Sequence, residues 1–143
     1  DKYGINVFNG QLIDADFEEQ YFDCIVTIHT LEHVFNPAEV IKECARIIRR
    51  GGIFVVEIPY IKDATKTQDV NDADLPVHLS YFTVETLKRL LESNAFVVID
   101  VQSGENIRMT AQKLPIINRL RMINFTNSKL MTRIKSRISK VFK

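Results

Sequence analysis

Glycine is scarce in this sequence, and its distribution excludes one kind of ligand-binding turn. Only five glycines occur in 143 residues, at positions 4, 10, 51, 52 and 104, and none forms a G-x-G pattern. A glycine-rich turn lets the backbone approach a bound ligand closely. We therefore expect no such turn in this chain.

Cysteines and long apolar runs are also few. Cys24 and Cys44 fall in separate apolar segments, where we expect buried free thiols rather than a disulfide. No window reaches 18 consecutive apolar residues, and no secretory signal opens the chain. These features predict a cytoplasmic protein of at most one domain. The chain begins at Asp1 within a pattern, which we interpret as a cut.

Acidic residues are missing from the end of the chain. Residues 113–143, the basic tail, carry nine Lys/Arg and no Asp/Glu, whereas residues 1–112 carry ten Lys/Arg and 18 Asp/Glu. Apolar residues recur in the tail at helical spacing, at Leu130, Ile134, Ile138 and Val141. A basic amphipathic helix binds an anionic membrane surface or a partner, or packs on its own domain. Nucleic acid is the least expected partner, because few aromatic residues interleave the charges.

Strand and helix patterns alternate along residues 1–112, which predicts an α/β fold. The segment Phe22–Ile28 is almost continuously apolar and β-branched, as in a strand buried on both faces of a parallel sheet. Further strands are predicted at Ile53–Ile58, Phe96–Val101 and Ile107–Gln112, with a weaker one at residues 5–12.

Two helices are predicted from their capping residues. Asn36 is the expected N-cap of the first, and Gly51-Gly52 are expected to end it. Thr83 is the expected cap of the second. Asn94 is expected to take the left-handed conformation after its last turn.

Two segments carry recognisable motifs. The first contains FDCI, HTLEHV, NP and RIIRRGG within residues 22–52, and the second contains HLSYFT at residues 78–83, followed by Leu87, Leu91 and Ala95-Phe96. Together they resemble class I S-adenosylmethionine-dependent methyltransferases, which have Gly where Ala95 stands. The resemblance covers residues 5–112. It implies the C-terminal portion of a Rossmann-like sheet, with strands four to seven and, if residues 5–12 form one, strand three.

The resemblance also implies S-adenosylmethionine as the cofactor. It places Ile28, His29 and Thr30 near the sulfonium, and Gln11 and Leu12 along the adenine, although Ile28 could instead be core. The family's glycine-rich loop and its ribose-binding acid have no counterpart in this sequence. We therefore expect the 143 residues alone to hold the cofactor poorly and to be inactive.

Histidines are the main candidates for catalysis. An oxygen acceptor must lose a proton, and an imidazole suits that role, so His29 and His78 are candidate bases. The alternative is that His78 only fixes loop backbone. With Glu32 and His33 they resemble the E-x-x-E-H…H metal set of small-RNA 2′-O-methyltransferases, where an ion would polarise the acceptor.

The first ligand of that set is His rather than Glu in this chain. Glu32 beside a helix N-terminus and His33 packed in a turn would explain the pair without an ion. We therefore assign Glu32 and His33 to the catalytic group and predict no metal.

These features predict a methyltransferase whose acceptor is an oxygen of a sugar, glycan or small metabolite. The alternative is a non-catalytic methyltransferase-like module that acts through the basic tail at a membrane or protein partner. The tail favours a location at the inner membrane surface. Since the family's first strand would lie beside Phe22–Ile28, we also expect that strand to expose an unpaired edge.

Overall fold

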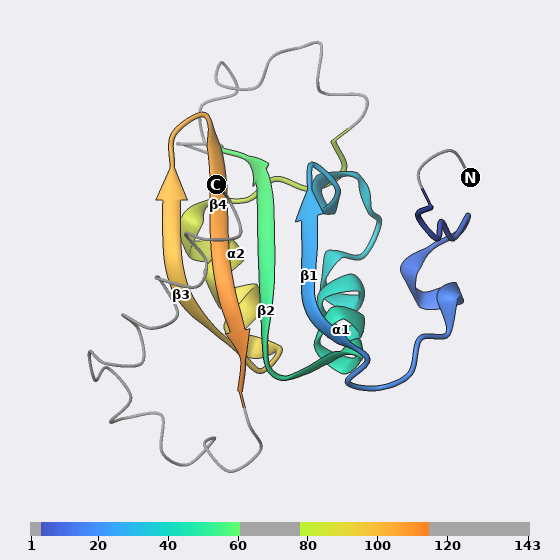
Figure 1. The fold of residues 1–143 in the computed structure, drawn as a ribbon. Helices are drawn as coiled ribbons and strands as arrows, with labels where there is room; N and C mark the ends of the chain where they lie inside the picture. Colours follow the sequence, from blue (N-terminus) through green and yellow to red (C-terminus); the bar gives the residue numbers. More distant parts are fainter. Residues whose placement is uncertain (1–3, 61–77, 115–143) are drawn as a thin grey trace. The chain divides into compact units, whose positions relative to one another are not determined.

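The computed structural model describes residues 4–60 and 78–114, in which a four-stranded sheet packs against two helices (Figure 1). The strands are β1 (Phe22–Ile28), β2 (Ile48–Pro59), β3 (Phe96–Ser103) and β4 (Asn106–Lys113). The helices are α1 (Pro37–Ile47) and α2 (Val84–Ser93), with short 3-10 turns η1 (Leu12–Ala15) and η2 (Leu31–His33). The predicted α/β fold is thus confirmed. The prediction of an amphipathic helix in the basic tail lies outside the described residues.

The strand order is β1-β2-β4-β3. β1 and β2 are parallel, whereas β4 is antiparallel to both β2 and β3. The strands predicted at Phe96–Val101 and Ile107–Gln112 are present as β3 and β4, and they pair as an antiparallel hairpin. β1 stands at one edge of this sheet and, within the described part of the chain, pairs only with β2.

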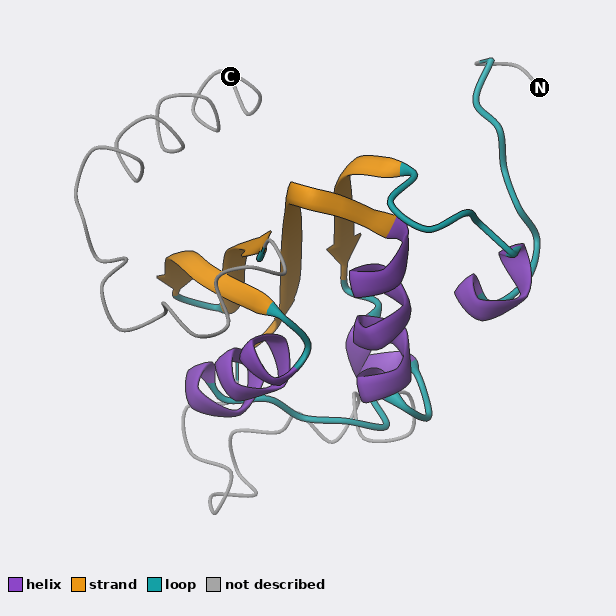
Figure 2. Ribbon diagram, turned by 90° about the horizontal axis from the view of Figure 1, so that it is seen from below, coloured by secondary structure: helices purple, strands orange, loops and turns teal. Residues whose placement is uncertain are grey.

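Both helices cover the same face of the sheet (Figure 2). Alternate residues of β2 point toward them, because successive side chains of a strand face opposite sides. They join one buried cluster that includes Phe54, Val56, Ile58, Ile41, Leu87 and Leu91. No helix of the described residues is long and apolar enough to cross a membrane.

The two predicted N-caps are confirmed. The Asn36 side chain accepts a hydrogen bond from the Glu39 amide at 3.3 Å. The Thr83 hydroxyl accepts one from the Thr86 amide at 3.2 Å, and the Thr86 hydroxyl accepts one from the Thr83 amide at 2.9 Å. Both helix starts are therefore fixed by bonds within three residues of sequence.

The predicted end of α1 is wrong. The helix ends at Ile47, because Ile48 is already extended with φ −81° and ψ 137°. Gly51 and Gly52 lie inside β2, where the β1–β2 register shifts. Gly51 has φ +75°, and a Cβ on Gly52 would lie 2.8 Å from the Arg49 carbonyl oxygen and 2.9 Å from the Asp23 carbonyl oxygen. Gly51 thus allows the left-handed conformation at the irregular start of β2. Gly52 allows the close approach of the Arg49 and Asp23 carbonyl groups.

The predicted left-handed residue after α2 is also wrong. Asn94 has φ −107°, and Ala95 takes the left-handed conformation with φ 66°. The left-handed residue of the turn into β3 is therefore the one where the family has glycine. Because a Cβ is disfavoured at positive φ, Ala95 is strained at this position.

The N-terminal segment and β1 differ from the prediction too. Residues 4–11 are exposed and form no strand, and no strand in the described part of the chain pairs with them. β1 is not buried on both faces: Val26 is 48% exposed, Ile28 55% exposed, and Cys24 is exposed rather than buried. Cys44 is buried as predicted. The cause is that both helices cover the same face of the sheet, so no helix of the described residues covers the other face of β1.

Candidate active site

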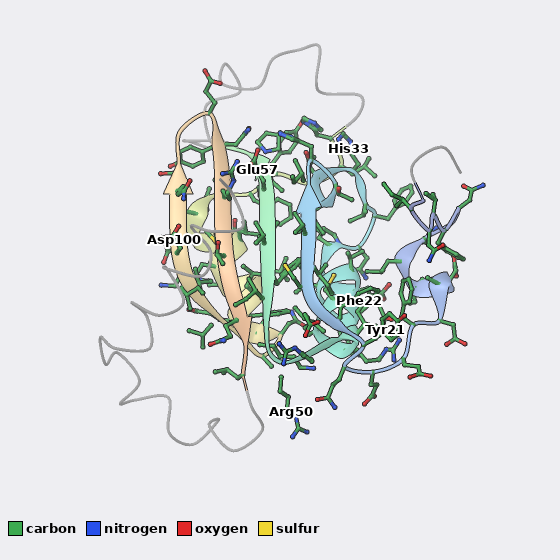
Figure 3. All side chains as sticks on the ribbon, in the orientation of Figure 1. Tyr21, Phe22, His33, Arg50, Glu57 and Asp100 are labelled. Carbon is green, nitrogen blue, oxygen red and sulfur yellow. The ribbon has the colours of Figure 1, made fainter. Side chains whose placement is uncertain are left out.

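Most of the candidate site lies where the parallel strands β1 and β2 end. His33 and Glu57 lie at this end of the sheet, whereas Phe22 and Arg50 lie at the opposite end (Figure 3). Open α/β sheets bind their ligands at the carboxyl ends of their strands. His29 thus lies where the sequence predicted it, and other polar side chains surround it there.

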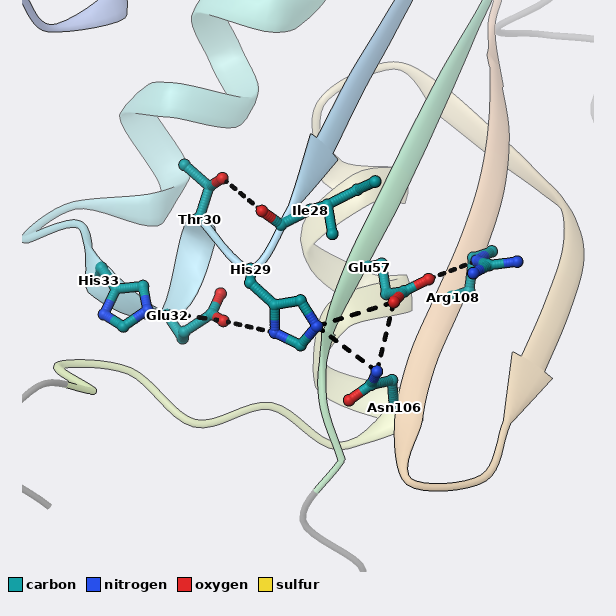
Figure 4. A network of polar contacts seen from close by, with 8 residues as sticks. All are labelled: Ile28, His29, Thr30, Glu32, His33, Glu57, Asn106 and Arg108. Atoms are coloured by element: carbon teal, nitrogen blue, oxygen red, sulfur yellow. Dashed lines mark hydrogen bonds and ion pairs between the residues drawn. The ribbon is translucent and has the colours of Figure 1, made fainter. Parts of the chain in front are cut away.

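His29 directly follows β1 and joins two carboxylates. Its Nδ1 lies 3.3 Å from Glu32 Oε1, and its Nε2 lies 3.7 Å from Glu57 Oε1 (Figure 4). Its backbone amide donates to the Glu57 carbonyl at 2.9 Å, with φ at +46°. A non-glycine residue in this region costs about 1–3 kcal/mol and is frequent at functional sites. The side chain is 45% exposed, so a substrate can reach the imidazole.

Glu57 is held by two residues of β4. Asn106 Nδ2 donates to Glu57 Oε1 at 3.3 Å and lies 3.5 Å from His29 Nε2. Arg108 Nε donates to the other oxygen, Glu57 Oε2. The sequence reasoning missed all three residues. The available signal was Glu57 itself, the charged residue within the otherwise apolar run Ile53–Ile58.

Glu32 is a buried carboxylate in η2. Its exposed fraction is 2%, and neither carboxylate oxygen has a hydrogen-bond partner among the described residues. Two imidazole nitrogens lie close to Glu32 Oε1, His29 Nδ1 at 3.3 Å and His33 Nε2 at 3.8 Å. A buried carboxylate needs a compensating positive charge, because desolvation disfavours its ionised form by several kcal/mol. The N-cap of α1 is Asn36, so Glu32 is not the capping residue of that helix.

His78 is brought to the same place by backbone hydrogen bonds. The amides of Leu79 and Ser80 donate to the Glu32 carbonyl at 2.7 and 3.0 Å. The rings of His78 and His33 are 4.8 Å apart between centroids. Ligand atoms of Glu32, His33 and His78 all lie within 4.8 Å of one another. The four residues predicted to be catalytic therefore lie close together, with Glu32 at the centre.

The residues assigned to the cofactor are divided between two places. Ile28 and Thr30 flank His29, and the Thr30 hydroxyl donates to the Ile28 carbonyl at 2.9 Å. Ile28 is half exposed, so it is not a core residue. Gln11 and Leu12 lie at the start of η1, which contacts α1. Their assignment to the adenine stays a prediction.

The fold and the position of the site define an α/β protein of the Rossmann-like class. A family model described as a methyltransferase domain matches residues 4–101. The chain belongs to this family of class I S-adenosylmethionine-dependent methyltransferases.

Curated relatives agree with this assignment. The chain is 28% identical over 97 residues to a "probable S-adenosylmethionine-dependent methyltransferase" of Mycolicibacterium smegmatis, covering 67% of this chain and 37% of the relative. It is 28% identical to the C-methyltransferase NovU of Streptomyces niveus, covering 66% of this chain and 25% of the relative. The chain thus spans about a quarter to two fifths of the length of these relatives.

Solved structures share the fold. A SAM-dependent methyltransferase from Thermotoga maritima has a TM-score of 0.65 at 20% identity, covering 78% of this chain and 66% of that one. The [4+2]-cyclase SpnF has a TM-score of 0.62 at 15% identity, covering 73% of this chain and 54% of that one. These likenesses establish the fold, and the chemistry has to be argued from the site.

Proposed function

We propose that this chain is part of a methyltransferase that transfers a methyl group to an oxygen of a sugar, glycan or small metabolite. In this proposal β1, β2, β3 and β4 are strands four, five, six and seven of the family's sheet. The observation that carries it is the position of His29, exposed at the carboxyl end of β1 and flanked by Glu32 and Glu57.

S-adenosylmethionine would supply an electrophilic methyl group when bound. The chain offers part of a surface for it: Ile28 and Thr30 are exposed beside His29, and an apolar side chain next to a polar one suits a mixed ligand. Gln11 and Leu12 are proposed to contact the adenine. No residue pattern in the chain offers the glycine-rich turn, so these positions fit only part of the cofactor.

His29 is the proposed general base. Glu32 Oε1 lies 3.3 Å from Nδ1, and a small adjustment of the ring would let it accept a hydrogen bond from Nδ1–H. This would leave the lone pair on Nε2, as an orienting carboxylate does in catalytic triads. Nε2 would take the acceptor's hydroxyl proton while the methyl group is transferred to that oxygen. Glu57 would stabilise the resulting imidazolium, and Asn106 and Arg108 hold Glu57 in place for that purpose.

Replacing His29 distinguishes catalysis by its imidazole from a purely structural role of this residue in the turn. Because His29 has positive φ, His29→Asn and His29→Gly remove the imidazole without adding strain. In a longer protein with a G-x-G-bearing segment before Asp1, both variants should lower kcat by about 10²–10⁴-fold and weaken cofactor binding by a much smaller factor. Full activity in both variants would show that His29 only shapes the turn.

Cofactor binding by the 143-residue chain gives a second test. We expect calorimetry to detect no micromolar binding of S-adenosylmethionine, because the chain has no glycine-rich turn for close backbone contact. The longer protein should bind. Micromolar affinity of the 143-residue chain for S-adenosylmethionine would contradict the proposal that the chain supplies only part of the cofactor site.

A second role is favoured by the charge of the sequence. Residues 113–143 carry nine basic and no acidic residues, which suits an anionic membrane surface. If the chain acts as a non-catalytic module, it should sediment with anionic vesicles through this tail, and the longer protein should lack methyl transfer.

A further inference from the structure

We infer that Glu32, His33 and His78 form a binding site for a divalent transition-metal ion. The three residues offer one carboxylate oxygen and two imidazole nitrogens, and these ligand atoms lie within 4.8 Å of one another. Such a set suits zinc or cobalt better than magnesium, which prefers oxygen ligands alone. This inference reverses the sequence-based prediction of no metal.

The backbone brings these ligands together from two distant parts of the chain. Glu32 and His33 lie in η2, just beyond β1. The segment that carries His78 is fixed to η2, because Leu79 and Ser80 both donate to the Glu32 carbonyl. The site is thus held by main-chain hydrogen bonds as well as by the side chains themselves.

The burial of Glu32 points independently to a bound cation. Its side chain is 3% exposed, and both carboxylate oxygens are buried without a hydrogen-bond donor in the described part of the chain. A carboxylate in such surroundings normally has hydrogen bonds, a charged partner or a metal. The imidazoles at 3.3 and 3.8 Å supply charge only when they are protonated, whereas a divalent ion supplies it in every state.

The geometry is close to that of a coordination site. Ligand bonds of about 2.0–2.2 Å place tetrahedral ligand atoms roughly 3.4 Å apart. His33 Nε2 lies 3.8 Å from Glu32 Oε1, slightly farther than in such a site. Three protein ligands leave a coordination position for water or a substrate oxygen. His29, which contacts the same Glu32 oxygen, would lie just outside the ligand set.

The site can be tested with the metal alone, without any methyl transfer. In calorimetry, the 143-residue chain should bind one equivalent of Zn²⁺ or Co²⁺ and bind Mg²⁺ much more weakly. His33→Ala and His78→Ala should each weaken Zn²⁺ binding by about 10-fold or more, since even residues behind a ligand affect affinity by about 10–100-fold. Bound Co²⁺ should show the visible absorption of imidazole coordination, and this should be lost in both variants.

Glu57→Gln is the matched control, because Glu57 is a carboxylate at the same end of the sheet but outside the ligand set. It should bind Zn²⁺ like the unaltered chain. Circular dichroism of every variant checks that the fold is kept. The inference is overturned if folded His33→Ala and His78→Ala bind Zn²⁺ as tightly as the control, or if the unaltered chain binds none. Neither outcome bears on the proposed methyl transfer, which His29 tests separately.

Discussion

Replacing Ala95 by glycine should stabilise the protein. Ala95 has φ 66° in the turn between α2 and β3, where its Cβ crowds the backbone. Its side chain is exposed, so the substitution removes little packing. The stability change is therefore governed by the backbone.

Two opposing free energies set the magnitude. The left-handed conformation costs a non-glycine residue about 1–2 kcal/mol. Glycine loses more backbone entropy on folding, which costs about 0.5–1 kcal/mol. The strain is the larger of the two, so Ala95→Gly should raise the free energy of unfolding by about 0.5–1 kcal/mol. With a urea m-value of about 2 kcal/mol/M, the unfolding midpoint should rise by about 0.3–0.5 M.

Urea unfolding followed by circular dichroism measures this change, with all variants at one protein concentration. Ala45→Gly is the control, since Ala45 lies in α1 at ordinary helical geometry. It should lower the free energy of unfolding by about 1 kcal/mol. If both substitutions lower the midpoint, Ala95 is not strained and the reasoning fails.

Other features of the structure lead to further measurements. Burial raises the pKa of Cys44 to about 12, so a thiol reagent should modify Cys24 first and Cys44 only on unfolding; equal rates would show an open core. The exposed edge at β1 should make the isolated chain self-associate, and Val26→Lys should reduce light scattering. Hydrogen bonds from Arg46 lower the pKa of Glu43, so this pair stabilises the fold above about pH 4.5, and the benefit is lost as pH falls through the lowered pKa. The stability difference between the unaltered chain and Glu43→Gln should therefore shrink as the pH falls below about 4.5, and a constant difference would exclude the effect.

The features that were predictable from the sequence depend on neighbours along the chain. Asn36 and Thr83 cap their helices through amides three residues away, so residue type and spacing were enough. The strands β1, β2, β3 and β4 were visible in their apolar patterns. The motifs around His29 and His78 located the site because they resemble a known family.

The features that could not be predicted depend on strand register and on the surroundings of each residue. Arg108 meets Glu57 only because β4 pairs with β2 in the register that places them opposite each other. The left-handed conformation moved from Asn94 to Ala95 because the chain has to enter β3 at that point. The pattern of β1 predicted two buried faces, but burial depends on which elements surround a strand.

The strand order also has a consequence for the sequence of folding events. β3 and β4 are joined by a short turn, whereas Ile53 of β2 pairs with Gln112 of β4, about 60 residues further along. Because the entropy of closing a loop rises with its length, the hairpin should form first and dock on β2 afterwards. The contacts of Glu57 with Asn106 and Arg108 belong to that later docking. The polar side of the site would then be completed among the last steps of folding, after the turn that holds Glu32.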